Sequence, residues 1–415
     1  MINIPKGTKD VLPEESYKWH YIEGIVRDIA RRFNLLEIRT PTFEATELFQ
    51  RGVGETTDIV NKEMYTFLDK GGRSMTLKPE GTAGVARSVI ENSLYLNVLP
   101  LKMYYIMPVF RYERPQTGRL REHHQFGVEI YGADTPQADA ETIAIAKNVF
   151  DSLNIKNLQL YINSIGCAKC RAEYNKALKS YLSVNLENMC ELCNDRFEKN
   201  PLRILDCKNE SCIKINENSP VIQDYLCDDC KKHQEGLINA LDTFGIDYQI
   251  NPRIVRGLDY YTKTVFEFVS NNIGAQGTVC GGGRYNNLVE EVGGKPCPAV
   301  GFGMGIERII MVMEELGIPF PEDYRPDIYV APLGDTITKC LEITCSLRNK
   351  GFSVETDLMN RSLKAQMKYA NKIKARYLIV IGSEEFKSGM VKLKNMDSGK
   401  EVLVPIEDIY KYLGD

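Results

Sequence analysis

The chain has no run of about 18 or more apolar residues, so the sequence predicts no membrane-spanning helix. Its first ten residues, MINIPKGTKD, lack the apolar segment of a secretory signal, which favours a cytoplasmic protein. Positive charge is not in excess, because 52 Lys and Arg are set against 56 Asp and Glu, a net charge of −4. A nucleic-acid surface would therefore be a local patch. What the chain does have is length, 415 residues, and 43% hydrophobic residues, enough for two or three domains of about 150 residues each.

Cysteine is plentiful and unevenly placed. Eight of the twelve cysteines lie within residues 167–230, in four close pairs: Cys167 and Cys170, Cys190 and Cys193, Cys207 and Cys212, Cys227 and Cys230. Without an export signal such pairs indicate thiols or metal ligands, not disulfides. Four pairs suffice for two structural zinc sites of four thiolates each. Reduced buried thiols and a redox or iron–sulfur role are the alternatives, and the spacing does not say which pairs share an ion.

The remaining cysteines occur singly. Cys280, Cys297, Cys340 and Cys345 stand in mutually unrelated contexts, and we expect them to be core thiols.

The cysteine-rich segment interrupts two stretches that are dense in glycine and aromatic residues. We expect residues 1–166 and 246–322 to form one catalytic domain, with 167–245 as a mainly helical insertion. A linker punctuated by proline at 316–326 predicts a second boundary. The sequence thus predicts a catalytic domain, an insertion and a separate C-terminal domain.

Residues 326–415 alternate short apolar runs with helical patterns, which predicts a small α/β domain with a largely parallel sheet. Strands are expected at 327–332, 352–355 and 376–382, and helices at 335–350 and 361–375. Basic residues at spacings of three or four would share one helical face: Arg361, Lys364, Lys368, Lys372 and Arg376. This stripe fits a polyanion-binding surface or a merely solvated face.

Two strands with a basic loop between them carry the first indication of a ligand site. Residues 102–113 alternate as a strand, and the chain returns at 123–132 after an arginine-rich loop. An antiparallel pair would direct Arg111, Gln125 and Glu129 towards one concavity, with Gly127 leaving space between the last two. That arrangement suits a small zwitterionic ligand; the alternative is a solvated sheet face with salt bridges.

These residues belong to a series of familiar motifs. Phe110–Glu113 with its arginine-rich loop resembles motif 2 of class II aminoacyl-tRNA synthetases, Glu37–Glu44 resembles motif 1, and Gly301–Arg308 resembles motif 3. Val255–Thr262 and Gly281–Tyr285 are similar to signatures of histidyl-tRNA synthetases. The resemblance runs over essentially the whole chain. It implies an α+β fold, with an antiparallel-sheet catalytic domain, the cysteine-rich insertion and a C-terminal α/β anticodon-binding domain.

The resemblance also implies a reaction and its participants. The expected activity is ATP-dependent formation of histidyl-adenylate with release of pyrophosphate, then transfer of histidine to the 3′ end of tRNA(His). ATP would enter with Mg²⁺, because the leaving pyrophosphate needs its charge neutralised. Since a carboxylate attacks a phosphate, positioned cations are the main catalytic requirement. A homodimer without membrane association is expected.

Matching positions imply roles for individual residues. The catalytic residues would be Arg256 and Arg111. Histidine would be held by Glu80, Gly81, Thr82, Arg111, Gln125, Glu129, Arg256, Tyr260 and Tyr261. ATP would be held by Arg111, Glu113 and Arg308, and the tRNA acceptor end by Gln116, Arg119 and Arg121.

Some positions depart from the family's pattern. Lys78 stands where arginine is commoner, and Asn286 where aspartate is usual, which puts any carboxylate role there in doubt. The alternatives are a non-catalytic paralogue that serves as a regulatory subunit in histidine biosynthesis, or a class II synthetase for proline, threonine or glycine. The three arginines at 111, 256 and 308 and the segment 326–415 disfavour the first, and the histidyl signatures disfavour the second.

Overall fold

The computed structural model describes residues 2–54, 57–116, 118–270, 277–321 and 325–413. The chain divides into two compact units, residues 1–321 and 322–415. The linker predicted at 316–326 spans this division, and its residues 322–324 lie outside the described residues. Among the described residues, no helix combines the length and apolarity needed to cross a membrane.

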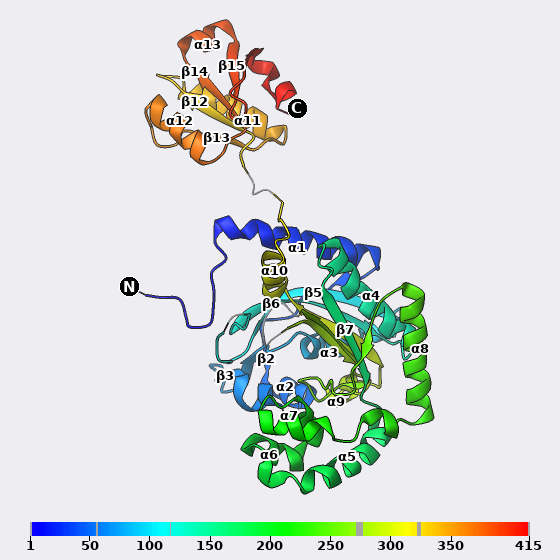
Figure 1. The fold of residues 1–415 in the computed structure, drawn as a ribbon. Coiled ribbons are helices and arrows are strands. Elements are labelled where there is room, and N and C mark those ends of the chain that lie inside the picture. The colour runs from blue at the N-terminus through cyan, green and yellow to red at the C-terminus, as the bar shows by residue number, and fades with distance from the viewer. Residues whose placement is uncertain (1, 55–56, 117, 271–276, 322–324, 414–415) are drawn as a thin grey trace. The chain divides into compact units, whose positions relative to one another are not determined.

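An eight-stranded sheet forms the frame of the first unit (Figure 1). In spatial order its strands are β1 (Leu36–Glu37), β5 (Leu101–Phe110), β6 (Glu122–Tyr131), β11 (Ala299–Gly305), β10 (Thr278–Arg284), β9 (Thr262–Ser270), β7 (Leu158–Ser164) and β8 (Gln249–Ile250). All neighbours pair antiparallel except β1 with β5 and β7 with β8. The antiparallel catalytic sheet expected from the motifs is therefore confirmed.

The hairpin β5–β6 differs from the prediction at one end. The strand expected to continue to residue 113 ends at Phe110, because the Glu113 amide donates back to the Arg111 carbonyl at 2.8 Å and turns the chain. The returning strand is confirmed, and its register sets Tyr105 opposite Gly127 and Met103 opposite Glu129.

Helices cover one face of this sheet: α1 (Pro13–Arg32), α4 (Pro136–Ser152), α8 (Asp228–Phe244) and α10 (Ile306–Glu315) (Figure 1). Their apolar sides meet the alternate residues of the strands, as at Ile143, Phe268 and Phe302, which are at most 2% exposed. Such period-matched burial is the main source of stability on this face of the sheet.

The opposite face of the sheet holds shorter elements: α2 (Thr46–Val53), η1 (Ile59–Glu63), α3 (Thr82–Glu91), η2 (Leu94–Leu96) and α9 (Leu288–Glu291). A three-stranded antiparallel sheet lies beside them, in the order β2 (Phe43–Ala45), β4 (Ser74–Leu77) and β3 (Tyr65–Leu68). The helix α3 packs against β5 through Val85, Ala86 and Val89. Its N-terminus is thereby fixed beside the sheet.

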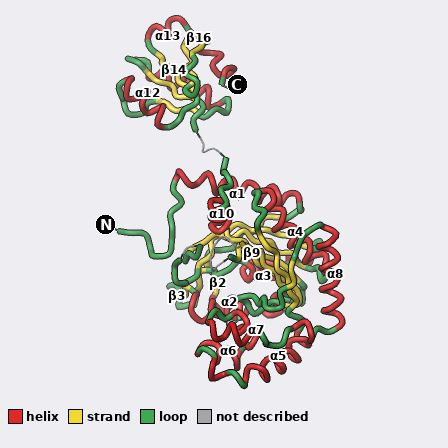
Figure 2. Tube along the Cα trace, viewed as in Figure 1, coloured by secondary structure: helices red, strands yellow, loops and turns green. Residues whose placement is uncertain are grey.

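The insertion joins β7 to β8 and consists of helices and loops (Figure 2). In order it contains α5 (Ala168–Ser183), η3 (Leu186–Asn188), α6 (Glu191–Lys199), η4 (Pro201–Asp206), α7 (Glu210–Glu217), η5 (Ile222–Tyr225) and α8. It has a core of its own, separate from that of the sheet, built around Tyr174, Leu178 and Leu182 together with buried cysteines. Because β7 and β8 are parallel, this segment is also their crossover connection.

The second unit contains β12 (Ile328–Pro332), α11 (Ile337–Asn349), β13 (Val354–Thr356), α12 (Leu363–Lys372), β14 (Tyr377–Ile381), α13 (Ser383–Ser388), β15 (Met390–Asn395), β16 (Glu401–Pro405) and η7 (Ile406–Tyr412). Its sheet has the order β13-β12-β14-β15-β16, with the first three strands parallel. The five elements predicted between residues 327 and 382 are all present. The prediction that the isolated cysteines are core thiols is confirmed for Cys340. It is wrong for Cys345, which is exposed on α11.

The basic stripe of this unit is narrower than predicted. Because α12 spans only residues 363–372, Arg361 and Arg376 lie outside it. Arg361 pairs with Asp357 at 3.0 Å, and Arg376 lies 3.7 Å from Asp327. What remains on the helix itself is a row of three exposed lysines, Lys364, Lys368 and Lys372.

Candidate active site

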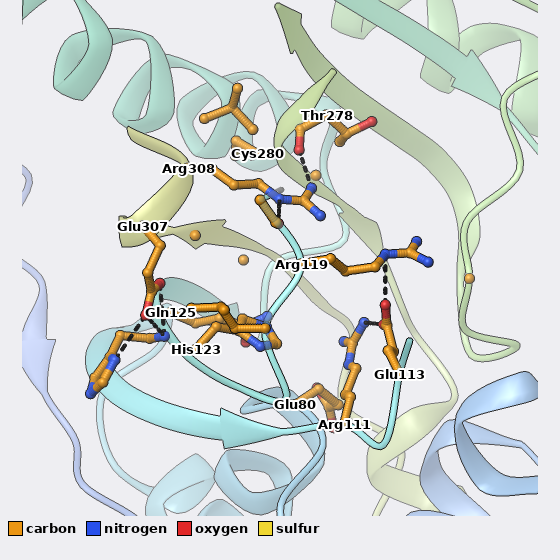
Figure 3. A pocket seen from close by; sticks show the side chains of 18 of the residues that line it. Glu80, Arg111, Glu113, Arg119, His123, Gln125, Thr278, Cys280, Glu307 and Arg308 are labelled. Atoms are coloured by element: carbon orange, nitrogen blue, oxygen red, sulfur yellow. Dashed lines mark hydrogen bonds and ion pairs between the residues drawn. The ribbon is translucent and has the colours of Figure 1, made fainter. Parts of the chain in front are cut away.

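A cavity of about 650 Å³ opens among the hairpin β5–β6, the segment 255–261 and the strands β10 and β11. Arg111, Arg256 and Arg308 all line it, although they lie far apart in the sequence. Figure 3 shows Arg308, Arg119 and Arg111 around this cavity, with Thr278 beside Arg308 and Glu113 beside Arg119. The structure thus brings together the three arginines that the motifs single out.

Backbone carbonyls hold two of these guanidinium groups. Arg111 Nε donates to the Pro79 carbonyl at 2.8 Å, and Arg308 Nε donates to the Gly118 carbonyl at 3.1 Å. Burial, reinforced by neighbouring Arg119 and Arg111, lowers the pKa of Arg308 below its usual value. A buried group of cations that repel each other is stabilised by an anion, so this end of the cavity is suited to phosphate.

Arg256 is held differently, by an acidic residue. Its Nη1 donates to Glu267 on β9, whose other carboxylate oxygen accepts from Thr278 Oγ1 at 3.0 Å. Burial opposes the charged form, yet Glu267 raises the pKa of Arg256 above its usual value. The guanidinium also fills the space beside Gly281, where a Cβ would collide with it. Glycine at that position of β10 lets Arg256 reach the cavity.

The loop after β5 places its polar residues unequally. Gln116 and Arg119 form a backbone bridge and line the cavity, and Arg119 Nε lies 2.6 Å from Glu113. Arg121 does not line it: its guanidinium stacks 3.9 Å from the Tyr112 ring centre and donates to the Glu113 carbonyl at 3.1 Å. Arg121 thus lies apart from Gln116 and Arg119 because a neighbouring aromatic ring holds it, and its contact with the tRNA acceptor end stays a prediction.

Beside Arg111 in the same cavity, a carboxylate caps a helix. Glu80 accepts from the backbone amides of Thr82 at 2.6 Å and Ala83 at 2.8 Å, the first amides of α3. Burial raises the pKa of Glu80, while these amides favour its charged form. Glu80, Thr82 and Gln125 all line the cavity, and Gly81 lies between the first two in the chain. An anion placed here suits the ammonium group of an amino acid.

Glu129 lies behind the wall of the cavity. It is fully buried, and its carboxylate accepts from Thr82 Oγ1 at 2.8 Å, from Tyr105 Oη at 3.2 Å and from the Tyr285 hydroxyl. Burial raises the pKa of Glu129 to about 8. The strand alternation predicted that Glu129 projects directly into the concavity, and the structure differs. Glu129 does not line the cavity, whereas Thr82 and Tyr105, whose hydroxyls donate to it, do.

The space beside Gly127 is filled rather than open. A Cβ on Gly127 would meet the phenol ring of Tyr105, and so would a Cβ on Gly81. The ring lies between the two glycines, and its hydroxyl reaches Glu129. The prediction that Gly127 leaves free space is thus wrong, because a bulky residue on the paired strand occupies it.

Two tyrosines complete the wall of the cavity. Tyr260 and Tyr261 are at most 5% exposed, line the cavity and have ring centres 4.7 Å apart. Burial raises the pKa of both phenols, so each keeps its proton and can donate it in a hydrogen bond.

Several lining residues were not found by the sequence reasoning. They are Tyr105, Asp206, Lys208, Glu267 and Thr278. Burial, with help from Arg111 and Arg308, lowers the pKa of His123 to about 3, so it is a neutral ring between cations. The sequence could have indicated Glu267, because it is a lone acidic residue within an apolar strand. No sequence pattern marks the other residues as part of a site.

The eight clustered cysteines form two groups of four. One is Cys167, Cys170, Cys227 and Cys230, and the other is Cys190, Cys193, Cys207 and Cys212; within each, the Sγ atoms lie within 4.8 Å of one another. The outer pairs therefore share one site and the inner pairs the other, which the sequence left open. These clusters could each hold a metal ion.

Together, the antiparallel sheet and the arginine-lined cavity beside a helix-capping glutamate define a class II aminoacyl-tRNA synthetase. The Histidyl-tRNA synthetase family profile matches residues 7–309, and the Anticodon binding domain profile matches residues 327–415. The chain belongs to the histidyl-tRNA synthetase family, the enzymes that ligate histidine to tRNA.

Individual relatives agree over the whole length. The chain is 59% identical to the histidine–tRNA ligase of Acetivibrio thermocellus, over 100% of this chain and 99% of the relative. It is 57% identical to that of Caldanaerobacter subterraneus subsp. tengcongensis, over 99% of each. The apo crystal structure of S. aureus histidyl-tRNA synthetase superimposes with a TM-score of 0.86 at 38% identity, covering 100% of both chains.

Proposed function

We propose that the cavity activates L-histidine with ATP and then transfers it to the 3′ end of tRNA(His). In the first step a carboxylate oxygen of histidine attacks the α-phosphorus, the bond to the bridging oxygen breaks, and pyrophosphate leaves. In the second, a terminal ribose hydroxyl attacks the carbonyl and AMP leaves. The observation that carries this proposal is one cavity lined both by three arginines and by the helix-capping Glu80.

The arginines would act on charge that develops in the reaction. Arg111 and Arg256 would hold the α-phosphate, Arg256 also the histidine carboxylate, and Arg308 the γ-phosphate. Because Arg111 and Arg308 are anchored by carbonyls through Nε, their remaining N–H groups are pre-oriented and need little rearrangement as charge develops. ATP enters as its Mg²⁺ complex, with Glu113 as the carboxylate beside the arginines.

Histidine would be recognised by Glu80 and the groups around it. Glu80 and Thr82 would hold the α-ammonium, Gln125 the carboxylate, and Tyr261 one imidazole nitrogen, with Tyr260 as wall. In this structure Glu129 would act through the hydroxyls of Thr82 and Tyr105. A side chain without ring nitrogens leaves such buried groups unpaired, which disfavours its binding strongly.

For the cysteine clusters we propose structural zinc. Tetrahedral zinc with thiolates at 2.3 Å requires sulfur atoms about 3.8 Å apart. The Sγ separations fit: 3.6 Å from Cys167 to Cys170, 3.9 Å from Cys167 to Cys227 and 3.7 Å from Cys190 to Cys207. Burial opposes ionisation, yet hydrogen bonds from Cys170 lower the pKa of the Cys167 thiol to about 7. A bound ion would supply folding stability and no chemical step.

The tRNA would meet two separate parts of the chain. Gln116 and Arg119, which line the cavity, would contact the acceptor end; Arg121 would support their loop from its place on Tyr112. The lysines of α12 in the anticodon-binding domain would add a salt-sensitive attraction to phosphate.

We also propose a homodimer in the cytoplasm. Exposed apolar side chains lie on the small sheet that contains the motif 1 segment, with Phe43 50% and Phe67 43% exposed. Pairing of two such faces would remove them from water. Free thiols on all described cysteines fit a reducing compartment. Sedimentation of purified protein tests the dimer, and a monomer at micromolar concentration would contradict it.

The activity is tested by amino-acid-dependent exchange of pyrophosphate into ATP. Histidine alone should support exchange, and Arg256→His should lose nearly all of it, about 10³-fold, because a preorganised cation is removed. Arg73→His is the matched control, since Arg73 lies in an exposed turn and pairs only locally with Asp69. Exchange with another amino acid would overturn the substrate, and exchange with none would favour the non-catalytic alternative.

A further inference from the structure

The segment that carries Arg256 is held by the insertion at four places. Arg253 donates to the carbonyls of Glu217 and Ser219, both at 2.9 Å. The Arg256 carbonyl accepts from Arg203 at 2.9 Å, Asp259 accepts from Asn200 at 2.9 Å, and the Tyr261 carbonyl accepts from Arg171 at 3.3 Å. Every donor or acceptor on the other side of these contacts belongs to residues 171–219. The active-site segment therefore contacts the insertion at several points between residues 253 and 261, while Asn163 of β7 holds the Ile254 carbonyl at 2.9 Å from the sheet side.

The contact at Arg256 comes from a largely buried side chain. Arg203, on η4, is 6% exposed, and its Nη1 donates to the backbone of the proposed catalytic arginine itself. A second arginine supports it from α6, since Arg196 Nη1 donates to the Arg203 carbonyl at 3.2 Å and Nη2 to Asp58 at 2.7 Å. Asn200, just before η4, binds Asp259. The short helix η4 thus acts as a platform beneath residues 256–259.

This platform cannot hold its shape by itself. η4 is a six-residue 3-10 helix, and isolated helices of this length are unstable in water. Cysteines stand on both of its flanks: Cys190 and Cys193 at the start of α6, and Cys207 and Cys212 after η4. Between these flanks, the Ile204 carbonyl of η4 accepts from Asn216 of α7 at 2.7 Å. An ion bound by these four thiolates would close the loop from 190 to 212 and fix η4 within it.

The same loop also forms part of the cavity wall. Asp206 and Lys208 flank Cys207 in the chain, line the cavity and pair with each other at 2.7 Å. Since Cys207 is a member of the cluster, any shift of this sulfur moves the two residues on either side of it. The cluster is thereby connected to the reaction site twice, through Arg203 and through this wall.

We infer that the cluster of Cys190, Cys193, Cys207 and Cys212, with zinc bound, is a positioning element for Arg256 in histidine activation. The bound ion would fix the position of η4, and η4 fixes the position of Arg203. Arg203 in turn holds the backbone carbonyl of Arg256, whose side chain would reach the phosphate. This inference rests on the proposed function. Arg203 is accordingly a positioning residue, with no contact to substrate required of it.

The test separates the contact from the metal. In Arg203→Met the four cysteines are intact, so zinc per chain should stay at two. The rate of histidine-dependent exchange should fall about 10- to 100-fold, as expected when a catalytic group is displaced by about 1 Å. The loss should lie in kcat more than in the KM for histidine, and Arg203→Lys should recover part of it. Amide hydrogens of residues 253–261 should exchange with solvent faster in the methionine variant.

A second variant removes the ion instead. Cys207→Ser with Cys212→Ser should lower zinc from two to one per chain and produce the same increase in amide exchange at 253–261. Lys214→Met is the matched control, because Lys214 is exposed on α7 of the same insertion and should change none of these readouts.

The outcomes distinguish the two proposals. Wild-type kcat and wild-type amide protection in Arg203→Met would overturn the positioning role while leaving the synthetase activity in place. Absence of histidine-dependent exchange in the zinc-loaded wild-type protein would instead overturn the proposed function. Unchanged amide exchange at 253–261 after loss of the second zinc would show that the cluster does not set this segment.

Discussion

The catalytic sheet and the insertion are built on different kinds of core. In the sheet's main cluster, one of the thirty-five buried residues is a cysteine, and the rest are aliphatic and aromatic side chains of strands and covering helices. In the insertion, five of the twelve buried residues are cysteines. Apolar burial therefore stabilises the sheet without a metal. In the insertion, by contrast, many of the buried side chains are thiols, which would contribute most to folding stability when they bind a metal.

The two regions nevertheless meet at a single functional segment. Residues 251–261 follow the insertion and β8 and lead into β9 of the sheet. Their backbone is held from the insertion side, while Tyr260 and Tyr261 pack into the core next to α3 and β5. Arg256 is thus located at the boundary between an apolar core and a cysteine-rich core whose stability would depend on a bound ion.

Metal removal should have the largest effect, and it should separate the insertion from the sheet. Structural zinc in small thiolate sites supplies about 10–16 kcal/mol of apparent free energy, far more than a small domain's net stability. After treatment with a strong chelator, amide hydrogens of α5, α6 and α7 should exchange rapidly, while those of β5, β6 and β11 stay protected. Hydrogen–deuterium exchange read by mass spectrometry checks this. Full protection of the insertion in metal-free protein would contradict the comparison.

Overpacking the sheet should have a smaller effect, confined to the other region. Gly127→Ala pushes a methyl group into the ring of Tyr105 and should cost about 1–3 kcal/mol of unfolding free energy. The displaced hydroxyl should also raise the KM for histidine, with zinc content unchanged. Gly24→Ala on α1 is the matched control: nothing lies within 4 Å of a Cβ there, so a gain of about 0.5–1 kcal/mol is expected. Thermal unfolding and exchange kinetics measure both.

Proton release on histidine binding sharpens the contrast further, because among the described residues the insertion buries no carboxyl group of this kind. The pKa of Glu129 is about 8, so at pH 7 most molecules hold it protonated. A bound ammonium group favours the carboxylate, and histidine binding at pH 7 should therefore release part of a proton. Calorimetry in buffers of different ionisation enthalpy measures it. Relative to Glu129→Gln, the release should vanish well above pH 8, where the group is already ionised; equal release in both proteins would contradict the assignment.

The smallest effect is expected for substitutions in the second unit, which contains neither the catalytic sheet nor the insertion. Replacing Lys364, Lys368 and Lys372 with glutamine should raise the KM for tRNA roughly 3- to 10-fold and flatten its dependence on salt. Pyrophosphate exchange with histidine should be unchanged, since these lysines lie in the second unit. An unaltered salt dependence of aminoacylation would show that this helix face is merely solvated.

Local patterns in the sequence predicted much of this structure. Alternating residues predicted β6, and short apolar runs predicted β12 and β14, each within a residue or two, because these patterns depend only on residues that are neighbours in the sequence. The motif arginines and Glu80 were predicted to share a site, and they line one cavity. Spacing in pairs was also sufficient to predict four-cysteine groups.

What could not be predicted depends on residues that meet only in three dimensions. The cysteine pairing, outer with outer and inner with inner, follows from how α5 and α8 return to each other. The place of Tyr105 between two glycines depends on strand register, and that of Arg121 on a neighbouring ring. Arg203 carries no motif at all, and its role arises from a contact 53 residues along the chain.

The crossover between β7 and β8 sets a limit on how far the chain could be shortened. Two antiparallel strands could be rejoined by a tight turn, but a parallel pair needs a connection of about a dozen residues or more that crosses from one end to the other. A minimised enzyme would therefore have to substitute the insertion with another crossover element. To keep Arg256 in place, that element would need to present its own donor to the same carbonyl.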